Sequence, residues 1–166
     1  MQTPSTTAGN GCADGAHEHL VEFYETDEFL VDTVCEFIAP ALRGDDAAII
    51  VATAEHRAAF AAGLAASGID VDAAAMAGRY LTFDAAELLD AFMVGDAPDP
   101  AIFRREIGSV IDRASAGGRR VRVYGEMVAL LWADGDIAST IALEDLWNDL
   151  GEARSFSLFC AYPMQG

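Results

Sequence analysis

The chain has 166 residues, the length of one compact domain, and 52% of them are hydrophobic, which is enough for a sizeable core and argues against global disorder. Its net charge is −17, and all ten basic residues are arginine. Such an acidic surface repels phosphate backbones and anionic membranes, so direct nucleic-acid binding and membrane docking are not expected. No apolar run approaches the roughly 18 residues that span a bilayer.

The amino-terminal segment differs from the rest in composition. Residues 1–16 are polar and small, without a basic start or an apolar middle, so they predict a disordered tail and not a secretory signal. Residues 17–166 are predicted to form a single domain. The three cysteines, Cys12, Cys35 and Cys160, are odd in number and lack a CxxC pair, which argues against a disulfide framework or a zinc site. We expect Cys35 and Cys160 to be core residues of a cytoplasmic protein.

Strand and helix patterns alternate along the chain. The predicted strands are 19–24, 47–52, 80–83, 119–124 and 155–161, and the predicted helices are 27–42, 55–67, 85–94, 102–116, 127–133 and 137–150. Asp27 suits the N-cap of the first helix, and Pro40 falls where it would end that helix early. This alternation predicts a three-layer α/β fold, with a mostly parallel sheet of about five strands and helices on both faces.

Ionisable and polar side chains follow each predicted strand. They are Tyr24, Glu25, Thr26 and Asp27 after the first strand, Thr53, Glu55 and His56 after the second, and Asp84, Glu126 and Tyr162 after the others. If the strands are parallel, these groups meet at one edge of the sheet, where α/β folds bind their ligands. The alternative is that each is an ordinary helix cap.

Residues 121–132 (VRVYGEMVALLW) are the most informative segment, because a short apolar strand ends in Gly125-Glu126 and leads directly into an apolar helix. Glu126 is therefore a candidate ligand contact, switch or catalytic group, or else a cap of that helix. We expect it beside Met127, Trp132 and the Cys160 strand, in a dry pocket that favours a protonated acid able to donate a hydrogen bond to a small neutral ligand. The predicted ligand-binding residues are His19, Tyr24, His56, Asp84, Glu126, Met127, Trp132 and Cys160.

Several catalytic patterns are missing from the sequence. The chain has no lysine, no GxxxxGKS/T and no GxGxxG, which argues against nucleotide hydrolysis by a phosphate-binding loop. No GxSxG elbow is present. His17 and His19 would share a face of a strand without a third ligand, so no metal site is predicted. We therefore expect a protein that is not an enzyme and uses no cofactor.

The sequence resembles the MEDS domain, a sensory domain of methanogen and methylotroph regulators that include a dichloromethane-responsive repressor. The resemblance covers residues 19–163. It rests on 19–24 (HLVEFY), 29–30 (FL), 78–80 (GRY), 83–85 (FDA), 92–93 (FM), 98–99 (PD), 121–132 (VRVYGEMVALLW), 143–150 (LEDLWNDL) and 156–163 (FSLFCAYP). It implies a degenerate RecA-like fold of the circadian-clock ATPase type without the phosphate loop. It also implies sensing of small organic molecules and signalling to a protein partner such as a histidine kinase or transcription regulator.

Three functions remain open from the sequence. A stand-alone sensory module, the favoured hypothesis, predicts a closed apolar pocket near Glu126. A non-enzymatic interaction scaffold with a collapsed nucleotide site predicts an exposed apolar patch or a homodimer interface. A metal-dependent enzyme predicts that Glu25, Asp27, Asp84 and Glu126 meet near His56 within metal-bridging distance. The chain ends soon after the resembling segment, so we expect output through another protein, unless the chain is a fragment.

Overall fold

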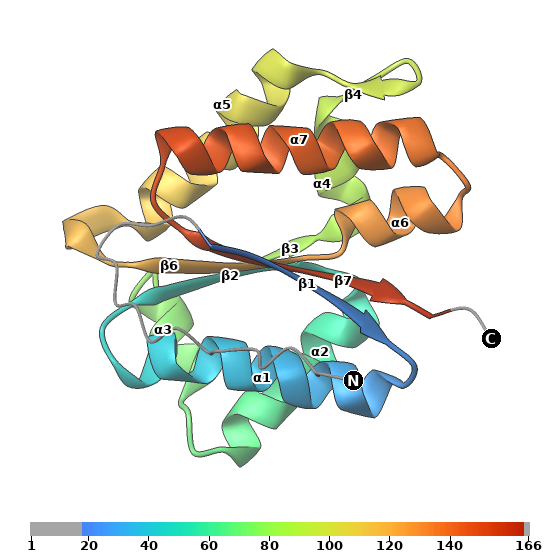
Figure 1. Ribbon diagram of the computed structural model, residues 1–166. Helices are drawn as coiled ribbons and strands as arrows, with labels where there is room; N and C mark the ends of the chain where they lie inside the picture. The colour runs from blue at the N-terminus through green and yellow to red at the C-terminus, as the bar shows by residue number, and fades with distance from the viewer. Residues whose placement is uncertain (1–17, 165–166) are drawn as a thin grey trace, which may run out of the picture.

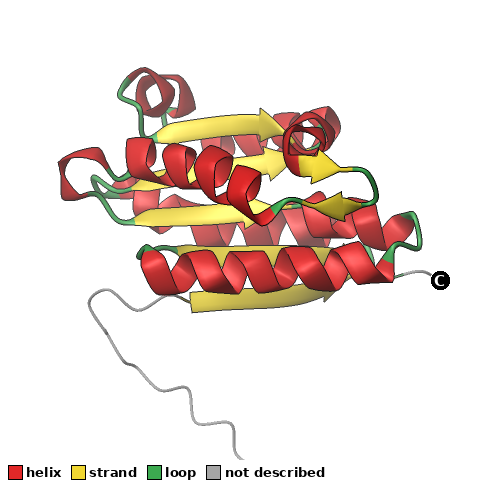
Figure 2. Ribbon diagram, turned by 90° about the horizontal axis from the view of Figure 1, so that it is seen from above, coloured by secondary structure: helices red, strands yellow, loops and turns green. Residues whose placement is uncertain are grey.

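The computed structural model describes residues 18–164, and the predicted tail over 1–16 lies outside them. Five parallel strands form the main sheet in the order β1-β7-β6-β2-β3 (Figures 1 and 2). The strands are β1 (Glu18–Tyr24), β2 (Ala47–Ala52), β3 (Tyr80–Asp84), β6 (Val121–Gly125) and β7 (Ser157–Pro163). The predicted α/β class and the five-stranded sheet are confirmed.

Helices cover both faces of this sheet, which completes the three layers (Figure 1). One face carries α1 (Asp27–Arg43), α2 (Ala54–Ala66) and α3 (Val71–Met76). The other face carries α4 (Ala85–Phe92), α5 (Pro100–Ala114), α6 (Met127–Ala133) and α7 (Ile137–Ala153). A small hairpin of β4 (Met93–Val94) and β5 (Ala97–Pro98) joins α4 to α5.

The two faces of the sheet contribute to two separate hydrophobic cores, and β2 shows why. All six of its residues are buried. Ile49 and Val51 join the core under α4–α7, whereas Ala48 and Ile50 join the core under α1–α3. Because successive side chains of a strand point to opposite faces, a central strand covered on both sides has to be apolar throughout. This requirement explains the uninterrupted apolar run.

β1 lies at one edge of the described sheet and is much less buried than β2. Successive side chains of β1 point alternately toward the two cores. Tyr24 packs on the α1–α3 side, whereas Phe23 stacks on Tyr162 on the opposite side, with ring centroids 5.6 Å apart. His19 and Val21 share the face of Phe23. The edge strand therefore presents polar and aromatic side chains beneath α7.

Some predicted boundaries were wrong. The N-cap of α1 is Thr26, not Asp27, since the Thr26 hydroxyl accepts a hydrogen bond from the Phe29 amide. Pro40 does not end α1 early, and the helix continues to Arg43. β7 runs through Tyr162 to Pro163, because Pro163 pairs with Tyr24 at the end of the edge strand. No described helix is both long and apolar enough to cross a membrane.

Candidate functional site

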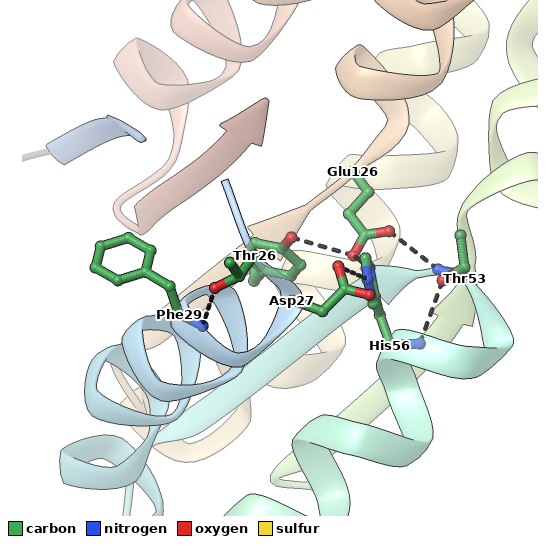
Figure 3. Close-up of polar contacts among 7 residues, drawn as sticks. Thr26, Asp27, Phe29, Thr53, His56 and Glu126 are labelled. Atoms are coloured by element: carbon green, nitrogen blue, oxygen red, sulfur yellow. Dashed lines mark hydrogen bonds and ion pairs between the residues drawn. The ribbon is translucent and has the colours of Figure 1, made fainter. Parts of the chain in front are cut away.

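The first polar cluster lies where β1, β2 and β6 end, as the parallel arrangement requires. Figure 3 shows its side chains pointing toward one another from the starts of α1 and α2 and from the β6–α6 junction. Glu126 supplies the carboxylate and is only 4% exposed. We call this cluster the Glu126 network. It consists of Asp27, Thr53, His56, Tyr124 and Glu126.

Glu126 accepts hydrogen bonds from three donors. Its Oε2 accepts from the Thr53 backbone N–H at 3.2 Å, and its Oε1 accepts from the Tyr124 hydroxyl at 3.1 Å. His56 Nδ1 lies 2.5 Å from the same Oε1. Both carboxylate oxygens of Glu126 are thus acceptors in this network, whereas the sequence led us to expect a group that donates a hydrogen bond to a ligand. Glu126 does occupy the N-cap position of α6, but among the described residues its side chain makes no cap hydrogen bond to that helix.

His56 joins two carboxylates at the start of α2. Its Nε2 lies 3.2 Å from Asp27 Oδ1, and its backbone N–H donates to the Thr53 hydroxyl, which caps the helix. The hydrogen bond to Glu126, more than any other contact, raises the pKa of His56 to about 9. His56 is therefore protonated at neutral pH, and its positive charge lies between Glu126 and Asp27.

Aromatic rings surround this network on the α1–α2 side of the sheet. Phe60 packs edge-on against Tyr124, with ring centroids 5.1 Å apart, and lies 5.8 Å from the His56 ring. Burial, together with the charges of Glu126 and Asp27, raises the pKa of Tyr24 to about 12. Burial also raises the pKa of Tyr124. Both phenols thus stay protonated, and Tyr124 is held as a donor to Glu126.

A second polar cluster lies on the opposite face of the sheet, between β1, β7 and α7. His19 Nε2 is 3.2 Å from Glu144 Oε2, and His19 Nδ1 is 2.9 Å from Asn148 Oδ1. The Tyr162 hydroxyl donates to Glu144 Oε1 at 2.5 Å. Cys160 is fully buried beside them, and this burial raises the pKa of its thiol. We call these five residues the His19 cluster.

A surface pocket of about 300 Å³ adjoins the His19 cluster. Its walls come from β1, α6, α7 and β7 near the carboxyl ends of the two strands. Two larger hollows, of about 420 and 360 Å³, flank α2 and are lined mainly by small and charged side chains. The pocket, called here the aromatic pocket, is lined by Phe23, Trp132, Thr140, Ile141, Glu144, Asp145 and Tyr162.

Exposed aromatic side chains form the rim of this pocket. Phe23 is 59% exposed and Trp132 is 42% exposed. Tyr162 lies between them, stacked on Phe23 and with its ring centroid 6.0 Å from that of Trp132. The closed pocket expected at Glu126 is therefore not among these three cavities. The pocket with aromatic walls is open and lies on the other face of the sheet.

The structure separates the eight predicted ligand-binding residues into different places. Tyr24, His56 and Glu126 come together at the first cluster. His19 and Cys160 meet at the second, and Trp132 lines the aromatic pocket. Met127 is buried in the core on the α4–α7 side. Asp84 caps α4 and pairs with Arg57 at 3.4 Å.

The predicted grouping of Glu126 with Trp132 and Cys160 was wrong, because the sheet lies between them. Cys160 pairs with Gly125 of β6 and faces the α4–α7 core. Tyr124 precedes Gly125, so its side chain points to the opposite face and carries the network there. Tyr124 was not predicted as a site residue. Its position two residues before Glu126 places it near the carboxylate, and this spacing could have identified it.

The family comparison matches residues 18–166 to the model of the MEDS domain, described as the methanogen/methylotroph, DcmR sensory domain. The chain belongs to the MEDS family. The match covers all the described elements, and the comparison with curated proteins gave no significant match. Membership of a sensory-domain family assigns a sensory or signalling role to this MEDS domain.

Proposed function

We propose that this MEDS domain binds a small, mainly apolar organic molecule in the aromatic pocket and signals through a protein partner. The observation that supports the proposal is the meeting of three aromatic rings and two carboxylates around about 300 Å³ of space. Ligand sites are typically apolar hollows with a few polar groups that fix orientation. This volume is at the lower end of the usual range, which suits a small ligand.

The chemistry of the lining indicates the kind of ligand. Phe23, Trp132 and Tyr162 offer ring faces and edges to an apolar body. Glu144 and Asp145 add carboxylate oxygens that accept hydrogen bonds. A compact hydrocarbon derivative with one donor group, or a small halogenated hydrocarbon, fits this lining better than a charged or phosphorylated compound, which the acidic surface would repel.

Signalling would follow from the position of the pocket between an edge strand and a helix. β1 and α7 are joined there by the contacts of His19 with Glu144 and Asn148. A ligand placed between Phe23 and Ile141 changes how these two elements present their exposed side chains. We propose that a regulatory partner, such as a histidine kinase or transcription regulator, binds this changed surface.

The module is proposed to act by binding and not by catalysis, on a degenerate RecA-like fold of the circadian-clock ATPase type. The parallel five-stranded sheet and the missing phosphate-loop motif support this relationship. At the carboxyl edge, Asp27 and Glu126 place negative charge where a triphosphate would need donors. The Glu126 oxygens also already accept from three donors, so that carboxylate offers little to a bridging metal.

Native mass spectrometry tests ligand binding directly, with dichloromethane, short alcohols and aromatic alcohols as probes. We expect one probe class to bind with one molecule per chain, and Trp132→Ala to weaken that binding at least tenfold because a ring of the pocket is lost. Ile137→Ala is the matched control, since Ile137 is 44% exposed and does not line the pocket. Equal binding by Trp132→Ala, or no binding of any probe, would contradict the proposal.

The exposed rim favours one second candidate, an interaction module without a ligand. Phe23, Trp132 and Ile141 form an apolar surface of the kind that marks protein contacts. Analytical ultracentrifugation separates the two functions. A homodimer that Trp132→Ala dissociates, combined with no retained small molecule, would favour the interaction module.

A further inference from the structure

His19 of β1, Glu144 of α7 and Cys160 of β7 converge although they are far apart in the sequence. One ring nitrogen, one carboxylate oxygen and the sulfur lie within 4.8 Å of one another. We propose that these three side chains bind a divalent transition-metal ion such as Zn²⁺, with a fourth position left for water or an added ligand. The sequence predicted no metal site, because the partners of His19 come from distant elements.

The His19 ring is oriented as a metal ligand would be. Its Nδ1 lies 2.9 Å from Asn148 Oδ1. An amide oxygen only accepts hydrogen bonds, so Nδ1 carries a proton and Nε2 is the nitrogen directed toward Glu144. Metal-binding histidines commonly donate their other ring N–H to an oxygen in this way, which fixes both the tautomer and the ring.

Glu144 is positioned in the same manner. Its Oε1 accepts a hydrogen bond from the Tyr162 hydroxyl, so Oε2 is the oxygen that faces His19 Nε2 at 3.2 Å. Each of these two side chains is therefore held by a partner on its far side and presents one atom to a common point. Such outer partners increase affinity for the metal.

The spacing and chemistry of the three atoms favour zinc over calcium or magnesium. Zinc bonds of about 2.0–2.3 Å in tetrahedral geometry place ligand atoms about 3.3–3.6 Å apart. The 3.2 Å between His19 and Glu144 is already close to this spacing, and the Cys160 sulfur has to approach by about 1.5 Å at most. Sulfur and imidazole ligands suit transition metals, whereas calcium and magnesium require oxygen.

A proton is the alternative cation between His19 and Glu144. A protonated His19 would form a simple ion pair with Glu144, and that pair would involve Cys160 only as a packed neighbour. The proposed metal requires the Cys160 sulfur as a thiolate. Direct observation of a metal–sulfur bond therefore separates the two arrangements.

Cobalt titration of the chelator-treated full chain tests the site. We expect one equivalent of Co²⁺ to produce thiolate-to-cobalt charge-transfer absorption in the near ultraviolet, and Zn²⁺ to displace it. Cys160→Ala should abolish this absorption, and Glu144→Gln should weaken cobalt affinity at least tenfold. Cys35→Ala and Cys12→Ala are matched controls that should keep it, because Cys35 lies on the other face of the sheet and Cys12 outside the proposed set.

Absence of the absorption, or its survival in Cys160→Ala, would overturn the proposal in favour of the ion pair. Loss in Cys12→Ala would overturn it as well, by moving the thiolate to the amino-terminal segment. Glu144→Gln keeps the thiol and changes a half-buried side chain, so it remains informative if Cys160→Ala fails to fold. The titration needs no organic ligand, so its failure leaves the proposed function of the aromatic pocket standing.

Discussion

The Glu126 network and the His19 cluster lie on opposite faces of one sheet and differ in how their polar groups are used. In the network, a carboxylate that is 4% exposed accepts from three donors, and none of the three cavities described is lined by it. In the His19 cluster, Glu144 accepts from Tyr162, lies 3.2 Å from His19 and also lines an open pocket. A group whose bonds are all made within the fold stabilises it, whereas a group that faces a pocket remains available to a ligand.

This difference assigns the two clusters separate tasks. The network ties together the carboxyl ends of β1, β2 and β6, because His56 joins Asp27 to Glu126 across them. The His19 cluster joins only the edge strand and its neighbour to α7. Edge elements unfold or shift more easily than central ones, which suits a region that must respond to a signal.

Glu126→Gln and Glu144→Gln form a matched pair that can break this comparison. We expect Glu126→Gln to lower the free energy of unfolding by about 3–5 kcal/mol, because it leaves His56 without its buried counter-charge. Glu144→Gln should cost less, about 1–2 kcal/mol, since the Gln oxygen can still accept from Tyr162 and the side chain lies at the open pocket. Urea unfolding of both variants measures the difference. Equal losses would show that the two clusters do not divide stability and binding as argued.

The pH dependence of stability sharpens the description of the network. The pKa of His56 rises from 6.5 to about 9 in the folded chain, so the fold favours the protonated form. Its contribution is fully present below pH 6.5 and is lost as pH rises through about 9. We expect a loss on the order of 1–3 kcal/mol across this window.

His56→Gln supplies the control for that measurement. Urea unfolding at several pH values should show a steep decline for the wild type and a nearly flat profile for the variant between pH 6.5 and 9. Cys35 and Cys160 reduce stability only toward pH 9 and above, because their raised pKa keeps them protonated in the fold while unfolded thiols ionise. A decline that persists in His56→Gln would assign the pH dependence to other groups.

The fold was largely predictable because burial on two faces leaves a plain pattern. The short apolar run 47–52 is typical of a strand covered on both faces, and the alternation of strands and helices predicts the three layers. α3 was missed because only Ala74 of its six residues is buried, so it carries no apolar stripe. The β4–β5 hairpin was missed because two-residue strands show no alternation, and its turn is marked only by Gly95 with φ 63°.

The candidate site was predictable only in part, because sequence order does not give sheet order. Glu126 stands out from the strand–Gly–Glu–helix pattern alone. Its partners depend on β6 lying next to β2, which brings Thr53 and His56 to it. Glu144 of α7 joins His19 because β7 inserts beside β1 under that helix. Tyr124 and Gly125 are successive residues of β6, so they face opposite sides of the sheet. This alternation decides which face each cluster occupies.

Asp27→Asn gives the smallest effect and tests where the network ends. The Asp27 side chain is 64% exposed, so removing its charge should change stability by less than about 0.5 kcal/mol. We expect the pKa of His56 to fall but to stay above 6.5, because Glu126 is the main cause of its rise. NMR titration of the imidazole protons measures this pKa, with Asp32→Asn as a control carboxylate on the same helix. If Asp27→Asn returned the pKa of His56 to its ordinary value, Asp27 and not Glu126 would be the group that keeps His56 protonated. The network would then be open to solvent and to ligands, like the aromatic pocket on the other face of the sheet.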